Sequence, residues 1–490
     1  MTEIDVQLLA QLRTWNPWWQ QGREGIDRYK DPSYKRELYT NICNQYKDGN
    51  QIVSIIGMRQ VGKSTLMRQV IKNLLDSGVD PKTILYISFD DPFVRVKYDK
   101  KKIFDIIVEI FLQGLIQEDL DVYKGTLYFF LDEIHQLPNW EKTLKTYYDR
   151  SFPIRYMVSG SSSIQLQSKN KESLLGRISE YVLWPFSFRE YLEFHENKDK
   201  QIQGVIQEAR EVFTKYNTTF DIHTIYESLQ DLYKKAFVWS KQPIQSNLQK
   251  FIVCGGFPRA WQQLDFISRQ RILWEQHVGK VIFEDLVQVA NIRKPRDLEF
   301  LFTYIIENNG KEVKLGEMKH NLNIHWETLD RYLSYLIRTF LIFRVERTKT
   351  KRLLQKRRSG NVKFYLTDVA LRNAFYNRTE DVFFDSEEMS FIAENLVCTA
   401  IERWLRGPKK EEQVSFYKDR SGEVDFIFKG PNNITPIEVK WRSDMPPLKT
   451  LLKLETSWST TQSLLITRDQ ELDLRGGRLS IPLWFFLLCF

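Results

Sequence analysis

Residues 57–64 read Gly-Met-Arg-Gln-Val-Gly-Lys-Ser, which has the glycine spacing and the closing Lys-Ser of a Walker A phosphate-binding loop. In such a loop, backbone N–H groups surround phosphates at a helix N-terminus, where the helix dipole favours negative charge. Lys63 would reach the β and γ phosphates, and Ser64 would place its hydroxyl on Mg²⁺. We therefore predict that Gly57, Gly62, Lys63, Ser64 and Thr65 bind ATP with Mg²⁺.

A magnesium ion also needs a carboxylate, and Asp132 and Glu133 supply candidates directly after the apolar run 127–131. Asp132 is predicted to be the acid on the metal side, and Glu133 the base that orients the attacking water. Either motif alone could be a chance turn or a solvated strand end. Their order in one chain, with strand and helix signals between them, indicates a nucleotide-hydrolysing site.

Two further positions fit this site less specifically. The loop at 158–162, which contains Ser159 and Ser161, follows a strand and could present a polar group to the γ phosphate, although it is equally an ordinary polar loop. Arg177 is a candidate arginine finger for a neighbouring subunit, because a cation there would neutralise charge that develops on the γ phosphate.

The elements that must hold these residues begin with short apolar runs at 51–56, 84–89, 127–131 and 155–158. Segments long enough for helices separate them, which is typical of a buried parallel sheet in an α/β domain. We expect a Trp-rich segment at 1–30, an ATPase core at 31–190, a helical lid at 191–295, a winged helix with a basic segment at 296–375, and a C-terminal α/β domain at 376–490.

A second candidate site lies near the C-terminus. Asp425 lies on one short predicted strand, and Glu438 and Lys440 lie on the next with the alternation that puts both on one face. Paired carboxylates bind hard cations such as Mg²⁺ or Mn²⁺, and a nearby lysine can activate water for phosphodiester hydrolysis. Glu394, at the edge of a buried helical stripe, is a third candidate ligand. A solvent-exposed hairpin with a Glu–Lys pair would have the same spacing.

Charge and hydropathy limit the kinds of partner and the cellular compartment that we expect for this protein. The net charge of +8 permits an anionic partner, and the run 347–358 holds seven Lys or Arg and no acid. This run could neutralise DNA phosphates or form a solvated wing. We expect a cytoplasmic protein that does not enter membranes, because we find no secretory signal and no apolar run long enough to span a bilayer. The four cysteines lack metal-ligand spacing.

Five motifs become recognisable when they are taken together: Gly-Met-Arg-Gln-Val-Gly-Lys-Ser-Thr-Leu at 57–66, Leu-Asp-Glu-Ile-His-Gln-Leu-Pro-Asn-Trp at 131–140, Leu-Leu-Gly-Arg at 174–177, Gly-Gly-Phe-Pro at 255–258 and Gly-Glu-Val-Asp-Phe at 422–426. In this order they resemble the bacterial and archaeal AAA+ ATPases of the AAA_14 family that carry a DUF4143 C-terminal region. The likeness extends over nearly the whole chain.

The resemblance implies an ATPase core of the origin-recognition and STAND-like branch and a C-terminal domain of the restriction-endonuclease-like PD-(D/E)XK type. It places Ser159 or Ser161 near the sensor 1 position, Arg177 near the arginine finger, and Pro258 with Arg259 near the lid element that touches the nucleotide. It also implies a homo-oligomer whose ATP site is completed between subunits.

The expected function is that of a metal-dependent ATPase that engages DNA, and cuts it with a nuclease-like C-terminal domain, in genome maintenance or defence. One alternative is an ATP-driven switch or interaction protein whose C-terminal domain binds nucleic acid or partners without cleaving. Another is a chaperone-like ATPase that acts on proteins.

Overall fold

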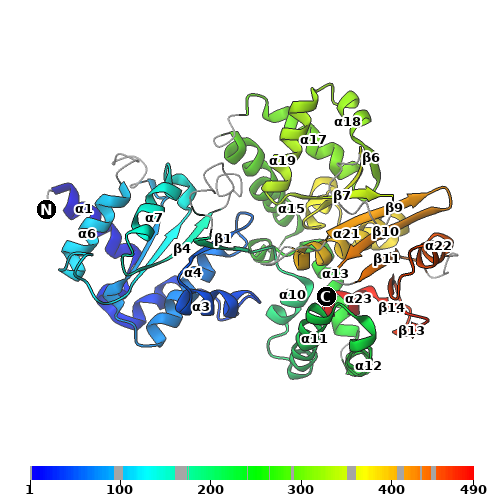
Figure 1. Ribbon diagram of the computed structural model, residues 1–490, viewed down its shortest axis with the longest axis horizontal. Helices are drawn as coiled ribbons and strands as arrows, with labels where there is room; N and C mark the ends of the chain where they lie inside the picture. Colours follow the sequence, from blue (N-terminus) through cyan, green and yellow to red (C-terminus); the bar gives the residue numbers. More distant parts are fainter. Residues whose placement is uncertain are drawn as a thin grey trace. The chain divides into compact units, whose positions relative to one another are not determined.

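A computed structural model describes residues 3–92, 103–160, 174, 176–239, 241–263, 265–287, 292–349, 360–405, 413–430, 433–442 and 448–490. The chain divides into two compact units, residues 1–183 and 184–490, and each is described by itself (Figure 1).

A parallel sheet of five strands, in the order β2-β3-β4-β1-β5, forms the centre of the first unit. The strands are β1 Ile52–Ile56, β2 Ile84–Ser88, β3 Leu127–Asp132, β4 Ile154–Gly160 and β5 Ile178–Val182. The first four are buried and match the predicted apolar runs. We did not predict β5, because this half-buried edge strand, Ile-Ser-Glu-Tyr-Val, lacks a continuous apolar run.

Helices cover both faces of this sheet, as alternate side chains of β3 demonstrate. Phe129 meets Phe111 of α6 with ring centroids 5.5 Å apart, whereas Phe130 meets Tyr46 of α3 at 5.1 Å. The helical elements of this unit, 3₁₀ and π turns included, are α1 Glu3–Trp15, α2 Trp18–Gln21, η1 Gly22–Tyr29, α3 Tyr39–Asp48, α4 Lys63–Asp76, η2 Pro81–Thr83, α6 Ile103–Phe111, η3 Leu112–Ile116, η4 Ile134–Gln136 and α7 Trp140–Asp149.

The N-terminal segment closes the free edge of β2. The buried Asn16 side chain donates to the carbonyl of Tyr86 at 2.8 Å and accepts from its N–H at 2.6 Å. The indole N–H groups of Trp18 and Trp19 both donate to the carbonyl of Ile84, at 3.1 and 2.7 Å. These side chains satisfy backbone groups that an open sheet edge would leave exposed.

The second unit holds a sheet of nine strands in the order β13-β14-β12-β11-β10-β9-β7-β8-β6. Its strands are β6 Glu312–Lys314, β7 Ile342–Thr348, β8 Asn361–Leu366, β9 Gln413–Asp419, β10 Gly422–Lys429, β11 Ile434–Lys440, β12 Ser463–Thr467, β13 Asp473–Arg475 and β14 Arg478–Pro482. Its helical elements are α10 Phe188–His195, α11 Lys200–Thr219, α12 Ile222–Trp239, α13 Lys241–Cys254, α14 Pro258–Trp261, α15 Phe266–Trp274, η5 Glu275–Gly279, η6 Val281–Asp285, α17 Pro295–Glu307, α18 Leu315–Asn321, α19 Trp326–Arg338, α20 Ala370–Tyr376, η7 Glu380–Phe384, α21 Ser386–Leu405, α22 Lys449–Trp458 and α23 Leu483–Cys489.

This sheet joins two segments that we expected to be separate domains. Strand β7, from the segment 296–375, pairs in parallel with β9, from the segment 376–490, and Arg347 lies opposite Phe416. The predicted boundary at 375/376, which falls in α20, therefore separates strands of one continuous sheet. The apolar pattern of each strand identifies the strand but not its partner, which is why the sequence did not reveal this pairing.

The helices expected to form an ATPase lid also lie in the second unit. Phe220, which caps the C-terminal end of α11, stacks on Trp404 with ring centroids 5.5 Å apart, and Tyr216 meets Phe490 at 5.1 Å. Arg189 of α10 donates to the carbonyl of Leu488 at 3.1 Å. Figure 1 shows α11 and α12 beside α23, so these helices cover the C-terminal α/β segment.

A glycine pair fixes the connection between α13 and α14. Gly255 has φ +70°, and an added Cβ would lie 2.7 Å from both Asp368 Oδ1 and Ala370 Cβ. A Cβ on Gly256 would lie 2.3 Å from the carbonyl oxygen of Phe186. The buried carboxylate of Asp368 accepts from the N–H groups of Gly256 and Ala370 at 2.7 and 2.9 Å. These contacts give a structural role to the Gly-Gly-Phe-Pro motif.

Candidate functional site

The predicted phosphate-binding loop connects β1 to α4. Gly62 precedes the helix with φ +103°, a conformation that side chains disfavour. A Cβ added to Gly57 would lie 2.2 Å from the carbonyl oxygen of Leu183. The two glycines of the motif are therefore required by the backbone itself, and the loop leads directly into the N-terminus of α4.

Lys63 begins α4, and its buried ammonium points back into the loop. It donates to the carbonyl oxygens of Gly57 and Met58 at 3.2 and 2.9 Å. Ser64 and Thr65 follow, half-buried, in the first helical turn. A helix N-terminus, an ammonium and two hydroxyls form the donor set that a nucleotide phosphate with Mg²⁺ requires, so these residues fit the expected ligands.

Asp132 lies at the carboxyl end of β3, at the same edge of the parallel sheet as the loop after β1. Its carboxylate is buried and accepts hydrogen bonds from the hydroxyls of Tyr86, at 2.8 Å, and Ser159. Burial and the charge of Asp132 raise the pKa of Tyr86 well above its usual value, so this phenol stays a donor. Both hydroxyls thus position the carboxylate.

Glu133 follows with a left-handed backbone, φ +49°, which turns the chain away from β3. Its N–H group donates to the hydroxyl oxygen of Ser159 at 3.3 Å, and its partly exposed carboxylate lies 3.2 Å from Nδ1 of His135. The structure therefore brings Asp132, Glu133 and Ser159 together. Ser161, the other predicted sensor candidate, lies outside the described residues.

Arg177, Pro258 and Arg259 were also predicted to belong to the nucleotide site. Arg177 precedes β5, and its carbonyl accepts from the N–H of Ile52 at the amino ends of the strands, the edge opposite the loop. Its guanidinium donates to Asp149 at 2.8 Å. Pro258 and Arg259 lie at the start of α14 in the second unit, where Arg259 is exposed.

The C-terminal candidate residues meet on the antiparallel strands β10 and β11. Phe426 pairs with Ile437, so Asp425 and Glu438 lie opposite one another one step along. Asp425 accepts from the N–H of Val439 at 2.8 Å, and Lys440 forms an ion pair with Glu438. Both carboxylates are buried, which distinguishes this pair from an exposed hairpin.

Glu394 reaches the same site from α21, together with residues that we had not predicted. Carboxylate oxygens of Glu394, Glu423 and Asp425 all lie within 4.8 Å of one another. Lys363 of β8 donates to Glu394 at 2.8 Å and also forms an ion pair with Glu423, and the hydroxyl of Tyr365 donates to Glu394 at 2.5 Å. Period-two alternation on β8 and β10 was the signal available in the sequence, because 363 and 365, like 423 and 425, share a face.

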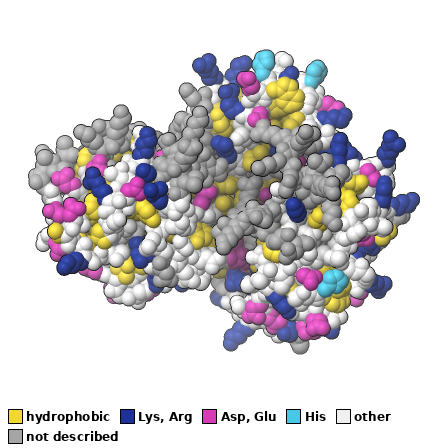
Figure 2. Space-filling model, viewed as in Figure 1, with side chains coloured by type: hydrophobic (Ala, Val, Ile, Leu, Met, Phe, Trp, Pro, Cys, Tyr) yellow, Lys and Arg dark blue, Asp and Glu magenta, His cyan; other side chains and the backbone are white. Residues whose placement is uncertain are grey.

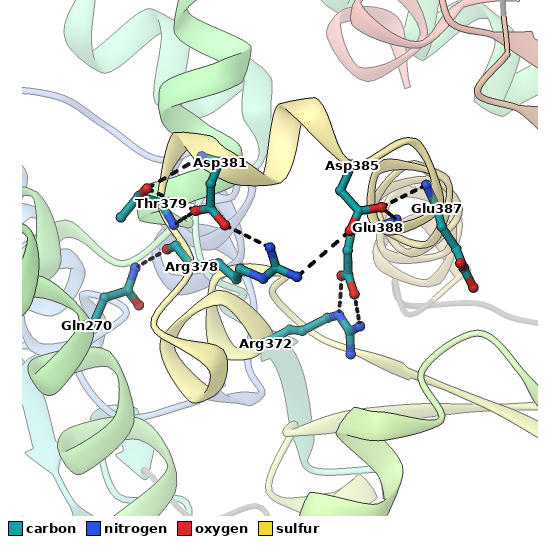
Figure 3. A network of polar contacts seen from close by, with 8 residues as sticks. All are labelled: Gln270, Arg372, Arg378, Thr379, Asp381, Asp385, Glu387 and Glu388. Atoms are coloured by element: carbon teal, nitrogen blue, oxygen red, sulfur yellow. Dashed lines mark hydrogen bonds and ion pairs between the residues drawn. The ribbon is translucent and has the colours of Figure 1, made fainter.

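A polar network at the N-terminus of α21 fixes the helix that presents Glu394 (Figure 3). Asp385 accepts from the N–H groups of Glu387 and Glu388 at 3.1 and 3.0 Å. The carboxylate of Glu388 binds the guanidinium of Arg372 in a bidentate pair at 3.1 and 2.7 Å, and Arg378 lies 3.8 Å from Asp385. Acidic groups at a helix N-terminus also complement its dipole.

Burial changes the protonation of this carboxylate site. Burial, with the nearby charge of Asp425 adding to it, raises the pKa of Glu394 to about 7 and that of Glu438 to about 8, against the opposing effects of Lys363 and Lys440. Burial alone would lower the pKa of Lys363, but the surrounding carboxylates raise it above its usual value, so this lysine is charged. Oxygen ligands of this kind suit Mg²⁺ or Mn²⁺.

Parts of this chain match known protein families and two uncharacterized proteins. Residues 49–192 match the AAA_14 family, described as an AAA domain, and residues 245–382 and 389–486 match two domains of unknown function, DUF8612 and DUF4143. An uncharacterized protein of Methanocaldococcus jannaschii is 25% identical over 390 residues, which cover 78% of this chain and 73% of that protein. An uncharacterized protein of Haemophilus influenzae is 24% identical over 388 residues, which cover 73% of this chain and 83% of that protein.

Two solved structures with similarity to this chain share little sequence with it. Aeropyrum pernix ORC1 in complex with DNA is 11% identical with a TM-score of 0.29, and the match covers 73% of this chain and 96% of that chain. S. cerevisiae Hsp104 with casein is 17% identical with a TM-score of 0.27, over 52% of this chain and 48% of that chain. TM-scores this low carry no argument about this chain.

Among the described residues, no helix is both long enough and apolar enough to cross a membrane. The AAA-domain match supports ATPase activity and implies ATP and Mg²⁺ as ligands. Together, the matches to AAA_14 and DUF4143 and the phosphate-binding loop on a parallel sheet support an AAA+ ATPase family for this chain.

Proposed function

We propose that this chain hydrolyses ATP to engage DNA, and that its C-terminal carboxylate site holds Mg²⁺ or Mn²⁺ and cleaves phosphodiester bonds, in genome maintenance or defence. The observation that carries the ATPase part is the common edge of the sheet. Lys63 and Ser64 after β1 and Asp132 at the end of β3 lie at this edge, and the hydroxyl of Ser159 of β4 donates to the carboxylate of Asp132.

Each residue at this edge has a distinct proposed role. Lys63 neutralises phosphate charge, Ser64 and Asp132 hold Mg²⁺, and Glu133 orients the attacking water. Lys63→Ala should therefore lose ATP binding, whereas Glu133→Gln should bind ATP and lose turnover. Equilibrium binding of a fluorescent ATP analogue, measured beside steady-state phosphate release, separates the two effects. Normal turnover in Glu133→Gln would contradict the assignment.

We further propose that Arg177 completes the ATP site of a neighbouring subunit in a homo-oligomer. At about 3.3 Å per residue, the five residues of β1 place the amino edge of the sheet roughly 15 Å from the loop, so Arg177 is remote from the loop of its own subunit. Pro258 and Arg259 are proposed to contact nucleotide as a lid element, because Arg259 is exposed at a helix start.

Two features support DNA as the partner. The elements α17, β6, α18, α19, β7 and β8 follow the order of a winged helix, with β7 and β8 as its hairpin. The basic run 347–358 begins with the last two residues of β7 and continues into the connection to β8, and all of it after residue 349 lies outside the described residues. Figure 2 shows Lys and Arg interleaved with acidic side chains over the visible face of the second unit, so DNA binding is assigned to this run rather than to that face.

Nuclease activity is proposed from Asp425 and Glu438 as metal ligands, Glu394 as a further ligand, and Lys440 as the group that orients water. The test is incubation of the full chain with linear, nicked and single-stranded DNA and Mn²⁺. The parent should cleave, Glu438→Gln should not, and Glu455→Gln, which changes a carboxylate paired with Arg478 elsewhere in the same unit, should cleave normally. Equal absence of cleavage in the parent and Glu438→Gln would remove the nuclease assignment.

A second candidate is an ATP-driven switch whose C-terminal site binds nucleic acid without cutting it. The observation that favours it is the pairing of Lys363 with Glu394 and Glu423 and of Lys440 with Glu438, which leaves much of the carboxylate charge already neutralised. DNA binding in an electrophoretic shift assay without Mn²⁺-dependent cleavage would select this function.

A further inference from the structure

We propose that Lys363 is a built-in cation of the C-terminal carboxylate site and competes there with a divalent metal ion. This inference rests on the metal site of the proposed function and concerns its regulation. Lys363 belongs to β8, more than sixty residues before Asp425, and it is not part of the Asp425, Glu438 and Lys440 pattern.

The position of the Lys363 ammonium is the main evidence for this competition. Lys363 is 2% exposed, and its Nζ reaches two carboxylates from different elements, Glu394 of α21 and Glu423 of β10. The same two carboxylates, with Asp425, have oxygens within 4.8 Å of one another. A divalent ion with oxygen ligands at about 2.1–2.4 Å needs ligand atoms at roughly this spacing. The ammonium therefore binds oxygens of two of the three carboxylates that a metal ion here would need as ligands.

The positive charge of Lys363 also supports competition with a metal ion. A buried ammonium held by two carboxylates supplies the positive charge that a metal ion would otherwise supply. Removing the Lys363 ammonium leaves Glu394 close to Asp425 and Glu423 with less positive charge between them, since of these lysines only Lys418 still pairs with Glu423, and this raises the affinity for a divalent cation. A lysine with only a structural role would instead leave metal affinity unchanged or lower it by distorting the site.

A neighbouring lysine provides a matched control. Lys418 also contacts Glu423, at 3.2 Å, but it turns outward to Glu312 at 2.9 Å, and its side chain is 40% exposed. Lys418→Met therefore removes a lysine from the same carboxylate without emptying the space between Glu394 and Asp425.

The experiment is calorimetric titration of Mn²⁺ into the full chain, without nucleotide, in a Ser64→Ala background that removes a metal ligand of the ATP site. Lys363→Met should bind Mn²⁺ at least about tenfold more tightly than its parent, and Mn²⁺ should raise its Tm by more. Lys363→Arg should match the parent, and Lys418→Met should lie within about twofold of it. If Lys363→Met does not fold, Lys363→Gln removes the same charge and carries the same expectation.

The outcomes separate this inference from the proposed metal site. Parent binding that is lost in Asp425→Asn, but unchanged or weaker in Lys363→Met, contradicts the role of Lys363 and leaves the metal site standing. Parent binding that survives Asp425→Asn contradicts the metal site itself. Tighter binding in Lys363→Met that Asp425→Asn abolishes supports both, and no Mn²⁺ binding in any variant overturns both.

Discussion

Ser159→Ala tests whether the buried hydroxyl on β4 positions Asp132 and Glu133, the proposed metal ligand and water-orienting base of the ATP site. The hydroxyl donates to the carboxylate of Asp132 and accepts from the N–H of Glu133 at 3.3 Å. A hydrogen bond to a charged group contributes about 1.5–3 kcal/mol, and its partners here are left buried when it is removed. If this hydrogen bond stabilises the transition state of ATP hydrolysis by that amount, the kcat of Ser159→Ala should fall roughly 10- to 100-fold.

The assay is steady-state ATP hydrolysis, with kcat and KM measured separately, because lost positioning lowers kcat rather than raising KM. Ser54→Ala is the matched control. Ser54 lies on the neighbouring strand β1, is equally buried, and has no hydrogen-bond partner among the described residues. A kcat for Ser159→Ala equal to that of Ser54→Ala would refute the positioning role.

Three further predictions follow from other parts of the chain. Arg177→Ala should lower ATP turnover, and mixing it with Glu133→Gln subunits should restore part of the activity, because a subunit with intact Arg177 then meets an intact site; no restoration would contradict a finger acting between subunits. Asp368→Ala leaves two buried N–H groups without their acceptor, so the free energy of unfolding in urea should fall by about 3 kcal/mol, and a loss below about 1 kcal/mol would contradict this role. The pKa values of Glu394 and Glu438 are raised to about 7 and about 8, so the metal-free folded state keeps protons that the unfolded chain releases at about pH 4.3. The free energy of unfolding should therefore fall as pH rises from about 5 to about 8, and it should fall less steeply in Glu438→Gln. Equal pH slopes in Glu438→Gln and the parent would contradict these raised pKa values.

The geometry of the candidate nucleotide site could largely be predicted from the sequence, because its signals are local. A strand, a glycine loop and a helix follow one another in the chain, and Asp132 comes directly after an apolar strand. The carboxyl ends of parallel strands share one edge, so the placement of these residues at the same edge of the sheet followed from strand direction.

The C-terminal site was predictable only in part. Glu438 and Lys440 share a face by period-two alternation, and Glu394 was recognisable at the edge of a helical stripe. Lys363 was not recognised, because its place among the carboxylates depends on the order of strands in a nine-stranded sheet. The same is true of α11 and α12, whose apolar stripes predict burial but do not identify the surface that they cover.

The most direct test of the central claim is the steady-state ATPase rate of the full chain in Mg²⁺, measured with and without DNA. We predict Mg²⁺-dependent hydrolysis that DNA changes several-fold and that Lys63→Ala abolishes. Hydrolysis that persists in Lys63→Ala, or no hydrolysis by the parent under either condition, would contradict the assignment of an ATPase site to the loop between β1 and α4.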